Sequence, residues 1–249
     1  MSKFAELVAK LDQIPHLNLG KKYDADILQW ELSKIDPALF VPFRSKSRHK
    51  DRIAECWHGL SLVAPHGSIH DDLTEEEYAG RTDSTWTPVA HSSPYIKQVI
   101  TELGGEGQRV RLNRLGAGKS LTWHRHGSEL SMIAGVAATG QRRPNWYELI
   151  VHVPVLSNDS VSYEVIATHV YELADFASGE LEINRKTYPQ GEAWAFNSAH
   201  YHNVFNRSDK DRYAIMMTLD IRMRRTFDIV SAAVERYIAN GEGPLMPAR

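Results

Sequence analysis

The residues best suited to chemistry are histidines that stand close together in two distant segments. His124 and His126 lie two apart in the run WHRHGSE, and His202 follows the alternating stretch GEAWAFN much later in the chain. Side chains two apart on an extended strand face the same way, so the first two can point to one side. Three imidazoles that converge in this way suit iron, zinc, copper or nickel, and ligand type alone does not choose the metal. Further histidines beside polar or turn residues are predicted to be exposed: His16, His49, His66, His70, His91 and His169.

A fixed positive charge is predicted close to these histidines. Arg212 begins the strand-like segment RYAIMMTL, which follows His202 after NRSDKD, a turn rich in Asn, Ser and Asp. That composition is typical of a hairpin. A guanidinium matches a carboxylate with two parallel hydrogen bonds. The pattern therefore indicates a site where a metal ion meets a carboxylate-bearing small molecule.

The elements that must position these residues are strands in the middle of the chain and helices on either side. Alternation of apolar and polar residues runs from about residue 108 to 222, whereas helical spacing marks residues 4–11, 24–35, 94–103 and 226–240. Histidines from remote strands converge only if a sheet folds back on itself, as in a small β-barrel. We therefore expect a mainly β core supported by helices.

Length and composition favour one soluble globular domain of 249 residues, 42% hydrophobic and 24% charged. Within it we expect an N-terminal helical segment (1–54) packed on a strand-rich core (55–222), and a C-terminal helix and tail (223–249). The net charge of -2 shows no basic excess, so no nucleic-acid partner is expected. No signal peptide or membrane span is visible and Cys56 is alone, which favours a cytoplasmic protein. The oligomeric state is left open.

Three blocks of the sequence resemble a known family. They are RLNRLGAGKSLTWHRH (111–126), IVHVP (150–154) and GEAWAFNSAHYHNVFN with DRYAIMMTLDI (191–221). They are similar to the aspartyl/asparaginyl β-hydroxylase family of Fe(II)/2-oxoglutarate-dependent oxygenases, in the proline cis-4-hydroxylase-like branch. The resemblance covers about residues 55–222. It implies a double-stranded β-helix, also called a jelly roll, with ferrous iron at its mouth.

The resemblance also implies a role for individual residues. His124 and His202 would be iron ligands, Arg212 would bind the far carboxylate of 2-oxoglutarate, and His152 and Asn113 would contact the same cosubstrate. The implied reaction consumes O2 and hydroxylates an unactivated C–H bond of an amino acid, a peptide side chain or a related small metabolite. The protein would then be an oxidoreductase with a small-molecule or peptide substrate.

Two positions depart from the family pattern. The position two after the first histidine is usually acidic or glycine but here is His126, so the site has three histidines, or His126 points away, or Glu129 replaces the carboxylate. The family often has arginine where this chain has Ile150, so Arg142 or Arg143 would have to compensate. Proximity in the sequence suggests residues that line the substrate site: Trp123, Ser128, Glu129, Arg142, Trp146 and Asn197.

Two other functions compete with this hypothesis. Gly118, His124, His126 and Glu129 are also similar to a cupin motif, which would give a three-histidine dioxygenase without 2-oxoglutarate. A non-catalytic jelly roll that binds a small anion is the other alternative. Arg212 has a role only in the two hypotheses that include an anionic ligand, namely 2-oxoglutarate or another small anion. Hydrolases are disfavoured, because the chain has neither G-x-S-x-G nor H-E-x-x-H.

Overall fold

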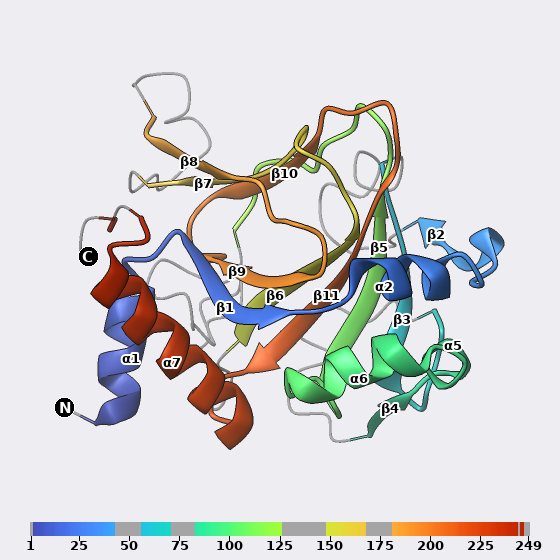
Figure 1. The fold of residues 1–249 in the computed structure, drawn as a ribbon, viewed down its shortest axis with the longest axis horizontal. Helices are drawn as coiled ribbons and strands as arrows, with labels where there is room; N and C mark the ends of the chain where they lie inside the picture. Colours follow the sequence, from blue (N-terminus) through green and yellow to red (C-terminus); the bar gives the residue numbers. More distant parts are fainter. Residues whose placement is uncertain are drawn as a thin grey trace.

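The computed structural model describes residues 2–42, 56–70, 83–125, 148–167, 181–243 and 245–246. Two antiparallel sheets form its centre. The larger has the order β1 (His16–Lys22), β9 (Glu192–Phe196), β6 (Glu148–Leu156), β11 (Arg212–Asp220), β5 (Arg109–Leu115), β3 (Trp57–Pro65) and β2 (Val41–Pro42), with β4 (Ser84–Trp86) paired to β3. The smaller contains β10 (His202–Asn206), β7 (Val161–Ile166) and β8 (Ile183–Lys186). Figure 1 shows the smaller sheet above the larger one.

The chain passes between the two sheets in the order of a double-stranded β-helix. Bridges Ser120–Phe205 and His124–His202 add the segment around residues 120–124 to the edge of β10. Successive segments therefore lie in the large sheet (β5), the small sheet (120–124), the large (β6), the small (β7 and β8), the large (β9), the small (β10) and the large (β11). This alternation confirms the predicted jelly-roll fold class, with helices toward both ends of the chain.

Helices cover the outer face of the large sheet. They are α1 (Lys3–Leu11), α2 (Ala25–Leu32), the 3-10 turn η1 (Pro37–Leu39), α5 (Pro88–His91), α6 (Pro94–Glu102) and α7 (Arg224–Asn240). The four helical segments predicted from spacing are present, and α7 ends at Gly241 in the left-handed conformation, with φ 58°. Strand β1 was not predicted. No helix among the described residues is long and apolar enough to cross a membrane.

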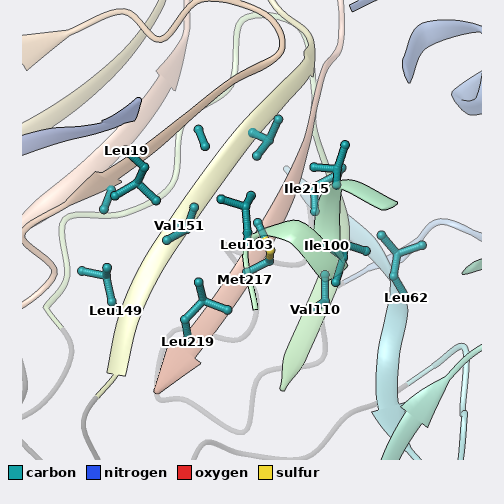
Figure 2. Packing of buried hydrophobic residues seen from close by; sticks show 14 of the residues in the cluster. Leu19, Leu62, Ile100, Leu103, Val110, Leu149, Val151, Ile215, Met217 and Leu219 are labelled. Carbon is teal, nitrogen blue, oxygen red and sulfur yellow. The ribbon is translucent and has the colours of Figure 1, made fainter. Parts of the chain in front are cut away.

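The two faces of the large sheet have different partners. Residues alternate across a strand, so Ile215, Met217 and Leu219 of β11 face the helices and join the main apolar core, shown in Figure 2. The opposite face, with Met216 and Leu115, packs on a second cluster that contains Tyr163 and Val204 of the small sheet. Burying each large apolar side chain contributes roughly 1.5–3 kcal/mol. The apolar core between the large sheet and the helices therefore stabilises the fold, and the interior between the two sheets can contain polar residues.

Candidate functional site

Polar residues of the large sheet gather on the face that meets the small sheet. On β11, Arg212 begins the strand, and Met216 lies opposite His152 of β6. On β5, Asn113 lies opposite Ala214 of β11. Arg212, His152 and Asn113 are at most 4% exposed. Polar side chains buried at alternate positions of neighbouring strands indicate a site in the interior of the jelly roll, because packing alone would favour apolar residues there.

His124 and His202 are paired directly across the edge of the small sheet. His202 N–H donates to the His124 carbonyl at 2.8 Å, and His124 N–H donates back to the His202 carbonyl at 3.2 Å. Their ring centroids are 4.3 Å apart. Two histidines far apart in sequence therefore lie side by side, and the pairing of the backbone fixes their relative position.

Backbone carbonyls set the protonation of both rings. The Nδ1 atom of His124 lies 2.7 Å from the Thr122 carbonyl oxygen, and Nδ1 of His202 lies 2.8 Å from the His200 carbonyl oxygen. A carbonyl oxygen only accepts, so each Nδ1 carries the proton and each Nε2 carries the lone pair. Metal-binding histidines typically use this arrangement, in which one nitrogen donates to a carbonyl and the other binds the metal.

No third candidate for a metal ligand joins the two histidines among the described residues. There, no three His, Cys, Asp or Glu side chains lie together as a metal site would require. The predicted candidates His126 and Glu129 lie outside the described residues, as do Ser128, Arg142, Arg143 and Trp146. The choice between a third histidine and a carboxylate therefore stays open.

Arg212 is a buried cation whose described neighbours are neutral. Its Nη2 donates to the Tyr163 hydroxyl oxygen and lies 3.3 Å from Nδ1 of His152. Arginine only donates, so His152 Nδ1 accepts and the His152 ring is neutral. No carboxylate of the described residues lies within ion-pair distance of Arg212, and its Nε is a buried donor with no acceptor there. An uncompensated buried charge is costly, so this guanidinium is suited to an anionic ligand.

Asn113, on the neighbouring strand β5, has half of its amide unused among the described residues. Its Nδ2 donates only weakly, to Met216 Sδ at 3.4 Å, and its buried Oδ1 has no hydrogen-bond partner in the described part of the chain. Gly59 makes room for it, since a Cβ at that position would lie 2.7 Å from Oδ1. A buried amide without a full set of partners is available to a polar ligand.

Phe196 of β9 connects the histidine pair to the arginine. Its ring centroid lies 4.7 Å from that of His202 and 5.3 Å from that of His152, on which it stacks. The ring centroid of Tyr163 lies 6.2 Å from that of Phe196. The two groups of polar residues therefore belong to one site with an aromatic wall.

Two of the predicted lining residues, Trp123 and Asn197, lie among the described residues and have defined contacts there. Trp123 packs edge-on against Phe205, with centroids 5.9 Å apart, as expected for the neighbour of His124 on an extended segment. Asn197 donates to the Asp12 carbonyl at 3.1 Å and accepts from the Ala199 N–H at 3.2 Å. These bonds hold Asn197 in the connection after β9, so its amide is used by the backbone.

His16 is buried, so its predicted exposure is wrong. It lies on β1, only 7% exposed, with Nε2 3.1 Å from the Asn184 carbonyl oxygen and Nδ1 2.7 Å from the Tyr188 hydroxyl oxygen. Burial lowers the pKa of His16 from 6.5 to about 4, although the hydrogen bond to the Asn184 carbonyl partly opposes this. The ring is therefore neutral at neutral pH.

Stability in mild acid should depend on His16. The pKa falls on folding, so the unfolded chain binds the extra proton between about pH 6.5 and 4. The stability from this group is complete above that window and is lost as pH falls through it, by about 3 kcal/mol at about 1.4 kcal/mol per pKa unit. We expect His16→Gln to remove this part of the pH dependence, measured as the free energy of urea unfolding at neutral and mildly acidic pH. Equal pH dependence in variant and parent would contradict a buried neutral imidazole.

Comparison with known proteins yields only remote structural likeness. No family model and no curated protein matches the sequence. HygX from Streptomyces hygroscopicus, with nickel and 2-oxoglutarate bound, is 12% identical, covers 88% of this chain and 86% of its own, and has a TM-score of 0.48. A 2OG-Fe(II) oxygenase family oxidoreductase from Burkholderia pseudomallei is 14% identical, with coverages of 78% and 75% and a TM-score of 0.42. A Bordetella pertussis cupin domain is 16% identical, with coverages of 44% and 78% and a TM-score of 0.26.

The class of protein is defined by the strand order rather than by these likenesses. Two antiparallel sheets with the chain alternating between them make this a double-stranded β-helix protein. What it does follows from the residues inside that fold.

Proposed function

We propose that the protein is an Fe(II)- and 2-oxoglutarate-dependent dioxygenase that hydroxylates a C–H bond of an amino acid, a peptide side chain or a related small metabolite. One observation carries the proposal: the buried Arg212, with no carboxylate among the described residues to pair with, lies in the same interior as the His124–His202 pair. A metal site alone, or a cation alone, would fit many proteins. Together they suit a ligand that chelates a metal at one end and carries a carboxylate at the other.

The histidine pair fits the metal half of such a site. Both Nε2 lone pairs are fixed by the carbonyls that accept from Nδ1, and neutral imidazoles are good ligands for Fe(II). His126 or Glu129 would complete the protein ligands. When bound, the iron would activate O2 and 2-oxoglutarate would supply electrons for its reduction.

The interior face of the large sheet fits the cosubstrate half. Arg212 would hold the distal carboxylate with its guanidinium fork, which keeps its charge at every relevant pH. Tyr163 accepts from Arg212, so its own hydroxyl hydrogen is available to a second carboxylate oxygen. His152 limits rotation of the guanidinium, and Asn113 offers a further polar contact. These neighbours orient the arginine before a ligand arrives.

Aromatic rings would exclude water from the same space. Phe196 packs on His202 and His152, and Tyr163 closes over Arg212 with its ring centre 5.2 Å from Cζ. Exclusion of water strengthens every charged contact inside the site and protects reactive species from solvent. The substrate would approach the metal from the side that these rings leave open.

Anaerobic titration with Fe(II), with and without 2-oxoglutarate, tests this function. We expect stoichiometric iron binding and, after the oxo acid is added, the weak visible charge-transfer band of a metal-bound 2-oxo acid. Pyruvate is the matched control, because it has the same chelating end but no distal carboxylate for Arg212. Iron binding without a band would favour the three-histidine cupin alternative. No iron binding would leave a non-catalytic binding protein.

A further inference from the structure

We propose that Tyr188 is a redox-active tyrosine and that the stack of Tyr163, Tyr188 and Trp194 carries an oxidising equivalent from the interior to the surface. The proposal goes beyond the hydroxylation of a substrate and depends on the proposed function only for the source of the oxidant. It concerns what happens when a strong one-electron oxidant forms inside the protein and no substrate is there to consume it. The three rings and the two groups that accept their protons carry the inference.

The rings form a continuous path. The centroids of Tyr163 and Tyr188 are 3.9 Å apart and those of Tyr188 and Trp194 are 5.0 Å apart, with the planes within 18° and 10° of parallel. At the inner end Phe196 bridges Tyr163 to His202. Electron transfer between aromatic rings is fast at contact distance, so each step of this path is short.

Tyr188 has a base positioned on its hydroxyl group. Nε2 of His16 faces the Asn184 carbonyl oxygen, which only accepts, so Nε2 carries the ring proton and Nδ1 is an acceptor. The Tyr188 hydroxyl must therefore donate to Nδ1 across 2.7 Å, in preference to the Ala195 carbonyl oxygen at 3.4 Å. Burial lowers the pKa of His16 and raises that of Tyr188, which keeps this neutral pair in place before oxidation.

Such a pair matters because an oxidised phenol is a very strong acid. Removing an electron alone would leave a positive charge on a ring that is 1% exposed. With His16 in place, the O–H bond of Tyr188 breaks and an N–H bond forms at Nδ1 as the electron leaves for the oxidant. The product is a neutral tyrosyl radical beside an imidazolium, and the oxidant is reduced by one electron.

Trp194 gives the path an outlet with its own proton acceptor. Its indole Nε1 donates to Glu192 Oε2 at 3.2 Å, and its 9% exposure exceeds that of the two tyrosines, at 1% each. Lys186 lies 5.2 Å from the ring centre, so a positively charged indole radical is disfavoured and loss of its proton to Glu192 is favoured. Transfer of an electron from Trp194 to the Tyr188 radical, with return of the proton from His16, is uphill. It is completed when a thiol or another one-electron donor in solution reduces Trp194 and Glu192 returns the proton to Nε1.

A photo-oxidant attached at the outlet tests the path without any metal. In a Cys56→Ser background, Lys186→Cys is labelled with a ruthenium photosensitiser, which is oxidised by a flash with an irreversible electron acceptor. We expect a tyrosyl radical in freeze-quench electron paramagnetic resonance, because the oxidant enters at Trp194 and is trapped at Tyr188. The matched control is the label at Lys34→Cys, where Lys34 lies 5.3 Å from the ring centre of Trp30, itself 60% exposed. That label should give a tryptophan signal only.

Two variants decide the assignment. Tyr188→Phe should reduce the tyrosyl signal to the level of the Lys34 label. His16→Gln should do so too, because glutamine still accepts the hydrogen bond but is too weak a base to take the proton. Tyr213→Phe, on the other face of β11, should leave the signal unchanged. An undiminished signal in either of the first two variants would overturn the proposal, and if Tyr188→Phe does not fold, His16→Gln decides alone.

This test uses no metal, so its outcome is independent of the proposed oxygenase function. A negative result here leaves that function intact, and failure of the protein to bind iron leaves this result intact.

Discussion

Arg212→Met is expected to weaken binding of 2-oxoglutarate strongly while leaving the free protein at least as stable as the parent. The loss of a buried charge-assisted pair costs about 2–5 kcal/mol, which corresponds to roughly 30-fold to 4,000-fold in Kd. The stability expectation comes from the surroundings of Arg212, where, among the described residues, Nε has no acceptor and no carboxylate compensates the charge. Replacing an uncompensated buried cation with an apolar side chain of similar length is often neutral or stabilising.

The two parts of this result separate a binding role from a structural one. If Arg212 served the fold, the Met variant would lose stability in proportion to its contacts with Tyr163 and His152. Calorimetric titration with 2-oxoglutarate and thermal unfolding of the free protein measure the two quantities independently. Arg212→Lys should keep the charge but lose most of the affinity, because an ammonium cannot form the two parallel bonds. Arg224→Ala, which removes an exposed arginine, is the control for net charge. Equal affinity in the Met variant and the parent would end the 2-oxoglutarate hypothesis.

Much of the fold could be predicted because alternation along a strand reports which face is buried. The segments around β5, β6, β9 and β11 were expected as strands from their sequence, and the helices from their spacing. Strand β1 could not be found in this way, because its alternation is limited to the four residues HLNL and the polar run GKK follows. It becomes a strand by pairing with β9, for example at His16 and Phe196, which are 180 residues apart in the sequence. Pairing partners at such separation leave no local signal.

The residues of the candidate site likewise fall into those that the sequence could predict and those that it could not. His124, His202 and Arg212 could be selected because their residue types are unusual at strand positions, and the structure brings the histidines together. Tyr163 and Tyr188 could not be selected in this way. Tyrosine is common in strands, and the importance of these two comes from contacts that only the folded structure shows. His16 was misjudged for a related reason: Pro15 before it suggests an exposed turn, whereas its partners in space, Tyr188 and Asn184, lie far away in the sequence.

His124→Ala and His202→Ala should each abolish stoichiometric binding of iron. Changes to groups that only orient metal ligands reduce affinity about 10–100-fold, so removal of a ligand should exceed that range. The measurement is anaerobic equilibrium dialysis of each variant with Fe(II), with His91→Ala as the control because His91 is exposed on α5. Full metal content in both variants would place the metal elsewhere.

The same assay can identify the third protein ligand of the iron. His126→Ala would remove a neutral group and Glu129→Ala a negative charge, and only the true ligand should lower the affinity for iron as much as His202→Ala does. If Glu129 binds, the bound ion keeps one formal positive charge, whereas three neutral imidazoles leave it with two. The more positive ion attracts the 2-oxo acid more strongly, so at saturating iron Glu129→Ala should raise the affinity for 2-oxoglutarate if Glu129 is the ligand and leave it unchanged if His126 is. A variant pair that binds iron equally well would mean that two histidines and solvent suffice, with Arg212 supplying the anchor for the cosubstrate.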